Sequence, residues 1–262
     1  MPVTPVAKHR PSRPSPLRRA WRLTRVAAHF THAAGVAGLA YPFMSIARRR
    51  RTLQRWSAGL VRHLAGNLTV HGEPPQHDTA FLLVANHVSW LDIFAINAAV
   101  PTRFVAKSEV RRWPLVGWLC VKADTLFIER ARPRDLARID TLIADALLGG
   151  DGAGAGMGVF LEGTTTDGTL VLPFHSSLLR PAQQANVPVV PVAIQYRRRD
   201  GSICTEVAYD GDKSVMDTLR LMLTQHEIQA HVHFLPPLAT AGVHRKALAL
   251  TARESIVRAL NV

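Results

Sequence analysis

Short apolar runs alternate with amphipathic stretches from Leu68 onward, and this alternation is the first guide to the fold. The runs have the length and composition of buried strands, and turn-forming or polar residues bound them. They predict strands at residues 80–85, 103–106, 125–128, 159–161 and 189–195, with weaker strands at 206–209 and 231–234.

Helices are predicted between these strands, most clearly over residues 133–148. Pro133 suits a first helical turn, apolar side chains recur on one helical face, and two glycines follow residue 148. Residues 245–260 form a second amphipathic segment. Because strands alternate with helices, the sequence predicts an α/β fold in which helices cover a mixed sheet.

The N-terminal part has a different pattern. Residues 26–47 form an uncharged run of 22 residues with arginines on both sides. At about 1.5 Å per residue the run could span a bilayer, but His29, His32 and Pro42 suit the bilayer interior poorly. A crossing helix would also carry one arginine cluster out of the cytoplasm. We expect a monotopic anchor, with a single-pass span or a helix packed on the domain core as alternatives.

These patterns divide the 262-residue chain into three parts. Residues 1–17, rich in proline and basic residues, are predicted to be a disordered tail. Residues 18–66 are predicted to be a helical membrane anchor, and residues 67–262 one α/β domain.

The charge distribution indicates a polyanionic partner. The net charge is +13, and residues 1–72 hold 13 of the Lys and Arg residues but no Asp or Glu. Nucleic-acid-binding arms rarely contain a long uncharged run, so we expect an anionic membrane surface and no nucleic acid. The two cysteines are too few and too far apart for a disulfide framework, which fits a reducing compartment. We expect the protein at the cytoplasmic face of the inner membrane.

The most informative stretch for chemistry is residues 81–92, FLLVANHVSWLD. An apolar strand delivers His87 to its end, where functional sites of α/β proteins collect. An imidazole there can take a proton from a hydroxyl, and Asp92 could accept the other ring N–H and stabilise the imidazolium. The alternative is structural: His87 ends the strand and Asp92 favours a helix N-terminus. Ser89 is predicted to cap that helix rather than to act as a nucleophile.

No cofactor or metal is expected. Residues 149–158 match a dinucleotide-binding pattern only loosely, and they lie between a helix and a strand rather than between a strand and a helix. His231 and His233 alternate along a predicted strand, but no further ligand stands at a recognised spacing.

The N-H-x4-D block that ends at Asp92 resembles the first motif of the glycerolipid acyltransferases related to 1-acylglycerol-3-phosphate acyltransferase. Further blocks follow in the family's order: RFVAK at 103–107, FIER at 127–130, FLEGT at 160–164 and VPVVPV at 187–192. The resemblance covers roughly residues 68–238. It implies that His87 is a general base, assisted by Asp92, and that an acceptor hydroxyl attacks an acyl thioester directly. The donor would be acyl-CoA or acyl carrier protein, the acceptor a lysolipid, and the pathway phospholipid biosynthesis.

The third block departs from the family at one position. EGTTTDG at 162–168 has Thr165 where the family usually has arginine, which grips phosphate with two hydrogen bonds. This variant resembles the subgroup that acylates lyso-ornithine lipid, and both acceptors stay open. The resemblance implies that residues of the second and third blocks bind substrate: Arg103, Lys107, Glu162, Gly163, Thr164 and Thr165.

Two other classes of protein fit parts of the sequence. A non-enzymatic basic membrane-binding protein would explain the charge but not the ordered blocks. A serine hydrolase would share the alternation of strands and helices, but the chain has no G-x-S-x-G elbow.

Overall fold

The computed structural model describes residues 14–76, 79–128, 133–149 and 156–262, with the side chains of residues 133–139 excepted. Its strands form one sheet in the order β1-β7-β6-β2-β5-β3-β4. The strands are β1 (Gly66–His71), β2 (Phe81–Ala85), β3 (Arg103–Lys107), β4 (Leu126–Ile128), β5 (Gly156–Phe160), β6 (Val189–Arg198) and β7 (Ile228–Phe234).

The sheet is mixed, which confirms the predicted fold class. Neighbouring strands run parallel, except that β6 and β7 pair antiparallel. The prediction missed β1, and the strand predicted at 206–209 is wrong. Thr205–Val207 is a 3-10 turn there, and Val207 and Ala208 reach the core without pairing to a strand.

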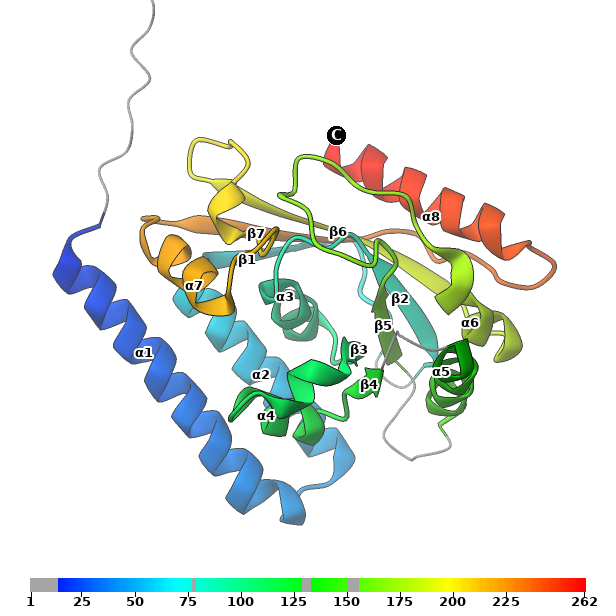
Figure 1. Cartoon of the computed structure of the whole chain (residues 1–262), viewed down its shortest axis with the longest axis horizontal. Coiled ribbons are helices and arrows are strands. Elements are labelled where there is room, and N and C mark those ends of the chain that lie inside the picture. The colour runs from blue at the N-terminus through cyan, green and yellow to red at the C-terminus, as the bar shows by residue number, and fades with distance from the viewer. Residues whose placement is uncertain (1–13, 77–78, 129–132, 150–155) are drawn as a thin grey trace, which may run out of the picture.

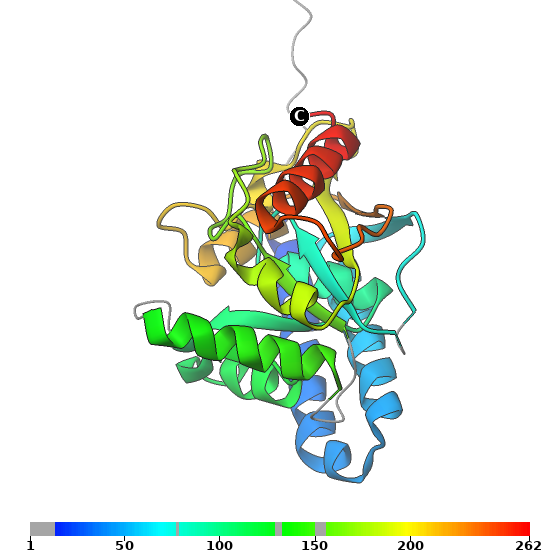
Figure 2. The same ribbon diagram turned by 90° about the vertical axis from the view of Figure 1, so that its right-hand side faces the viewer.

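Helices cover both faces of the sheet (Figures 1 and 2). Helices α1, α2, α3 and α7 share a core with one face, whereas α5, α6 and α8 pack on the other. The helices are α1 (Pro16–Gly35), α2 (Ile46–Leu64), α3 (Leu91–Ala99), α4 (Val116–Lys122), α5 (Pro133–Leu147), α6 (Arg180–Gln184), α7 (Val215–Leu223) and α8 (Arg245–Leu260).

The uncharged run at residues 26–47 does not form one continuous α-helix. Helix α1 ends at Gly35, a π-helical turn covers Val36–Ala40, and a 3-10 turn with Pro42 near its start covers Tyr41–Phe43. The Ser45 hydroxyl accepts the Arg48 N–H and begins α2. No helix in the described part of the chain is long and apolar enough to cross a bilayer. Of the predicted tail at 1–17, residues 1–13 lie outside the described part, and α1 already includes Pro16.

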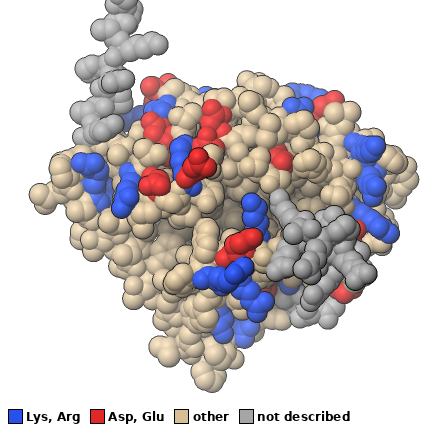
Figure 3. All heavy atoms as spheres, in the orientation of Figure 1, with Lys and Arg blue, Asp and Glu red and all other residues tan. Residues whose placement is uncertain are grey.

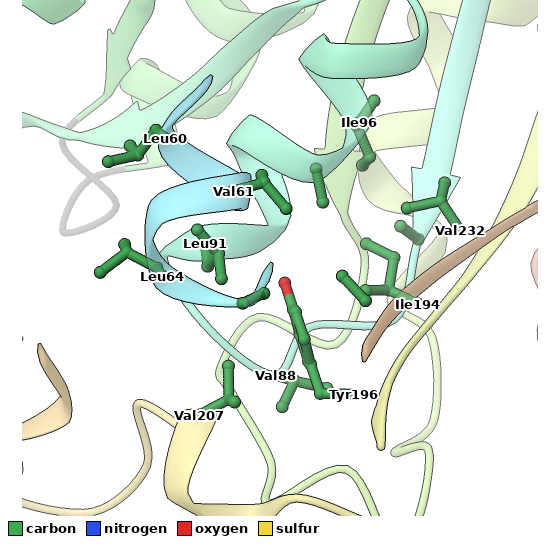
Figure 4. Packing of buried hydrophobic residues seen from close by; sticks show 14 of the residues in the cluster. Leu60, Val61, Leu64, Val88, Leu91, Ile96, Ile194, Tyr196, Val207 and Val232 are labelled. Atoms are coloured by element: carbon green, nitrogen blue, oxygen red, sulfur yellow. The ribbon is translucent and has the colours of Figure 1, made fainter. Parts of the chain in front are cut away.

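Helix α2 belongs to the core of the α/β domain. Leu60, Val61 and Leu64 are fully buried in the same cluster as alternate residues of β2 and β6 (Figure 4). Arg22 ties α1 to this core, because its guanidinium donates to the Leu64 and Gln225 carbonyls. The segment predicted as an anchor, residues 18–66, therefore also contributes to the stability of the domain.

Candidate active site

His87 lies just beyond β2, near the middle of the sheet. Every residue of β2 is buried, as expected for a strand with helices on both faces. The Asn86 side chain continues the pairing of β2 with β6: its amide donates to the Ile194 carbonyl at 3.0 Å and accepts the Ile194 N–H at 2.8 Å. These two hydrogen bonds fix the backbone directly before His87.

The structure brings His87 and Asp92 together. His87 Nδ1 lies 2.8 Å from Asp92 Oδ2, and the imidazole stacks on Phe160 with ring centroids 3.8 Å apart. With Nδ1–H donating to the carboxylate, Nε2 carries the free lone pair of the neutral ring. The His87 side chain is 20% exposed, whereas Asp92 is fully buried. This is the arrangement of a general base with an orienting carboxylate.

Asp92 accepts hydrogen bonds at both carboxylate oxygens. Oδ2 also accepts the backbone N–H groups of Val88 and Ser89, at 2.8 and 3.0 Å. The prediction that Ser89 caps the helix is wrong, because its buried hydroxyl has no hydrogen-bond partner among the described residues. The Asp92 carboxylate satisfies the N–H groups that precede α3 instead.

Tyr196 on β6 holds the second carboxylate oxygen of Asp92. Its hydroxyl donates to Asp92 Oδ1 at 2.8 Å, and Figure 4 shows the side chain within the core. Burial, together with the nearby Asp92 charge, raises the pKa of Tyr196 well above its usual value, so the phenol remains a donor. Sequence reasoning missed this residue. The available signal was a hydroxyl-bearing aromatic residue directly after the strand predicted at 189–195.

Glu162 binds the backbone N–H of His87. Oε1 accepts the His87 N–H at 2.7 Å, and Oε2 accepts the Leu172 N–H at 2.8 Å. Burial raises the pKa of Glu162, although both hydrogen bonds favour the ionised form. Since both oxygens are occupied by backbone donors, the geometry assigns Glu162 to positioning His87 rather than to contacting substrate.

A cavity of about 1250 Å³ opens beside His87. It is larger than the roughly 300–1,000 Å³ of a site for one drug-sized ligand. Apolar residues of α1, α2, α3 and α4 line most of it, and Phe30, Trp56, Phe94 and Leu119 are examples. Such a wall suits a long hydrocarbon chain.

The residues predicted to bind substrate lie at different places relative to this cavity. Lys107, Gly163, Thr164 and Thr165 line it. Thr165 Oγ1 donates to the Tyr209 carbonyl, which leaves only its lone pairs for a ligand. Arg103 is not among the described lining residues, and its Nε donates to the Asp124 carbonyl at 3.1 Å.

The described lining offers little support for a covalent intermediate. It contains no serine, and burial raises the pKa of its one cysteine, Cys120. A thiol with a raised pKa is a poor nucleophile near neutral pH. Among the described residues, the one group of three side chains close enough to share a metal ion is His71, His231 and His233, and none of these lines the cavity.

Comparisons with known proteins agree with this arrangement. The profile of the family described as Acyltransferase matches residues 67–195. The lyso-ornithine lipid O-acyltransferase of Pseudomonas aeruginosa is 39% identical over 212 residues, which cover 81% of this chain and 79% of that protein. The 1-acyl-sn-glycerol-3-phosphate acyltransferase of Neisseria meningitidis serogroup B is 32% identical and covers 71% of each chain.

A solved structure shares the fold. The 1-acyl-sn-glycerophosphate acyltransferase PlsC from Thermotoga maritima superposes with a TM-score of 0.68 over 93% of this chain and 96% of that one, at 23% identity. The identity and coverage of the sequence relatives, together with the matched profile, show that this chain belongs to the acyltransferase family.

Proposed function

We propose that the protein transfers a fatty acyl group from an acyl thioester to the hydroxyl of a lysolipid, with His87 as general base. The observation that carries this proposal is the placement of His87: Nδ1 is bound to Asp92, and the ring lines an apolar cavity. A general base needs this access together with a fixed tautomer.

The reaction follows from these positions. His87 Nε2 takes the proton of the acceptor hydroxyl as its oxygen attacks the thioester carbonyl. The C–O bond forms, the C–S bond breaks, and the leaving thiolate takes the proton from the imidazolium. Buried Asp92 balances the charge of the imidazolium during transfer. The donor is a thioester of coenzyme A or of acyl carrier protein.

His87→Ala tests the proposal. Loss of a positioned general base should lower kcat by about 10²–10⁴-fold while the protein stays folded. Release of free thiol from the acyl donor, measured with each of the two donors, gives the rate. Near-normal turnover in a folded His87→Ala protein would contradict the mechanism.

We further propose that lyso-ornithine lipid is the preferred acceptor. Two points support this: Thr165 stands where, by the resemblance, the family usually has a phosphate-binding arginine, and its hydroxyl already donates to the Tyr209 carbonyl. The lone pairs left on Thr165 suit an ammonium group better than a phosphate. Lys107 in the cavity lining supports the alternative acceptor, 1-acylglycerol-3-phosphate.

Thr165→Arg tests the acceptor. A charge-assisted hydrogen bond contributes about 1.5–3 kcal/mol, so the variant should raise kcat/KM for lysophosphatidic acid relative to lyso-ornithine lipid by roughly 10–100-fold. Thr169→Arg is the matched control, since exposed Thr169 lies in the same loop but does not line the cavity. Preference for lysophosphatidic acid in the wild type, unchanged in Thr165→Arg, would assign the phosphate to Lys107.

We also propose a monotopic attachment to the cytoplasmic face of an anionic membrane, through α1, the turns that follow it, and α4. Leu39 and Phe43 are 79% and 86% exposed, and Trp118 of α4 lies beside Gly38. Figure 3 shows few charged atoms along the lower left of this face, where α1 lies. Exposed basic residues flank the apolar surface, among them Arg18, Arg25, Arg48 and Arg51. Basic and apolar contacts together give stable binding at an interface.

Point substitutions test the attachment, because deleting residues 18–66 would also remove core residues of α2. Leu39→Ser with Phe43→Ser should reduce sedimentation with phosphatidylglycerol-containing vesicles. Leu148→Ser is the control, since Leu148 is 68% exposed beyond α5, on the other side of the sheet. Equal sedimentation of both variants would place the attachment elsewhere.

A further inference from the structure

Three histidines gather at the β1 edge of the sheet. His71 on β1 is paired in register with His233 on the neighbouring strand β7, and His231 lies two residues before His233. Residues of β7 alternate between buried and half-buried, and all three histidines are half-buried. Val232 packs in the core beneath α2 and α3, so His231 and His233 project from the opposite face of the sheet.

The imidazole nitrogens lie within a small volume. His71 Nε2 is 3.2 Å from His231 Nδ1, and the His71 and His233 rings stack with centroids 4.1 Å apart. One ring nitrogen from each residue lies within 4.8 Å of the other two. Tetrahedral zinc with Zn–N bonds of about 2.0–2.1 Å places its ligand nitrogens about 3.4 Å apart. Side-chain rotations that tilt the stacked His71 and His233 rings toward a common point would satisfy this geometry, and the metal would replace the His71–His231 hydrogen bond.

Metal ions bind the neutral form of imidazole, and one imidazole nitrogen of this cluster lacks a partner in the described part of the chain. His231 Nε2 is buried without a hydrogen-bond partner among the described residues. Arg197 is the nearby cation, and its guanidinium donates to Gln195 Oε1 and to the Gly201 carbonyl.

We propose that His71, His231 and His233 form a zinc site that fastens edge strand β1 to β7. Three imidazole ligands leave a fourth position for water. His71 and His231 are 160 positions apart in the sequence, so the unfolded chain cannot offer the same site. Zinc bound in this way would stabilise the folded state and hold the strand that follows α2.

Zinc titration of the full-length protein tests the proposal. The protein should be purified in detergent without a polyhistidine tag, stripped with a chelator, and titrated with zinc chloride by calorimetry. We expect saturable binding of one zinc per chain and a rise in Tm of roughly 5–10 °C at free zinc 100-fold above Kd. Cobalt in place of zinc should give the visible absorption of a tetrahedral site.

Substitutions separate this site from incidental metal binding. His71→Gln on the edge strand and His231→Gln should each weaken zinc binding at least ten-fold and abolish the Tm rise, with folding checked by circular dichroism. His175→Ala removes an exposed histidine elsewhere and should change neither quantity. Absence of saturable binding by the wild type, or equal binding by folded His71→Gln, would overturn the proposal.

Discussion

Replacing Asp92 by asparagine isolates the charge of this residue from its hydrogen bonds. An amide oxygen in place of Oδ2 can still accept the N–H groups of His87, Val88 and Ser89, and the amide nitrogen then faces the Tyr196 hydroxyl. That hydroxyl can rotate and act as an acceptor. The imidazole should therefore keep its orientation, while the negative charge that stabilises the imidazolium is lost.

The magnitude follows from the spacing of the two charges. Unit charges about 4 Å apart interact by about 4 kcal/mol at an effective dielectric constant near 20. At about 1.4 kcal/mol per tenfold change in rate, Asp92→Asn should lower kcat by about 10³-fold. Asp92→Ala, in contrast, leaves several buried N–H groups unpaired at about 1–3 kcal/mol each and should unfold far more easily.

The assay is a double-mutant cycle on thiol release. If Asp92 acts through His87, Asp92→Asn should have almost no further effect on kcat in a His87→Ala background. Circular dichroism melts should show Asp92→Asn close to the wild type in Tm. A folded Asp92→Asn protein with kcat within tenfold of the wild type, or an undiminished effect in the His87→Ala background, would refute the reasoning.

Three further outcomes are expected. Tyr196→Phe removes one hydrogen bond to a buried carboxylate and should lower the free energy of unfolding by about 1.5–3 kcal/mol in urea titrations, with a much smaller loss of kcat than Asp92→Asn. In Glu162→Gln, the new amide N–H group would face one of the two backbone N–H donors that Glu162 now accepts, so both Tm and kcat should fall. If Glu162 only bound substrate, the variant would instead raise KM at unchanged Tm. Burial lowers the pKa of His29 and His63, so below about pH 6.5 the unfolded state binds more protons than the folded state. Unfolding free energy should therefore be flat above about pH 7 and fall toward pH 5. Removal of both imidazoles should reduce that slope, to which His231 and His233 also contribute because burial lowers their pKa.

The alternation of apolar runs was sufficient to predict most strands, and amphipathic stretches were sufficient to predict α5 and α8, because each of these elements buries one or two regular faces. The strand β1 was missed because its side chains alternate only weakly between exposed and half-buried at the sheet edge. The 3-10 turn at Thr205–Val207 was mistaken for a strand because it buries apolar side chains without strand pairing.

For the site, the contact between His87 and Asp92 could be predicted because the two residues are close along the chain. Tyr196 could not, because its role depends on the pairing of β6 beside β2, which brings together residues 104 positions apart. For the same reason, the spacing of His231 and His233 along the chain could not indicate that His71 lies beside them. Long-range pairing in the sheet, rather than residue type, determines both contacts.

The cavity beside His87 has a consequence for how the enzyme meets its substrates. Its walls include residues of α1 and α4, such as Phe30 and Leu119, that belong to the surface proposed to lie on the membrane. A lysolipid could then slide from the leaflet to the imidazole while its chain stays within an apolar environment. Under that condition the quantity that sets the rate is the mole fraction of lysolipid in the surface. Adding inert phospholipid at constant total lysolipid should slow the enzyme, even though the bulk molarity of its substrate is unchanged.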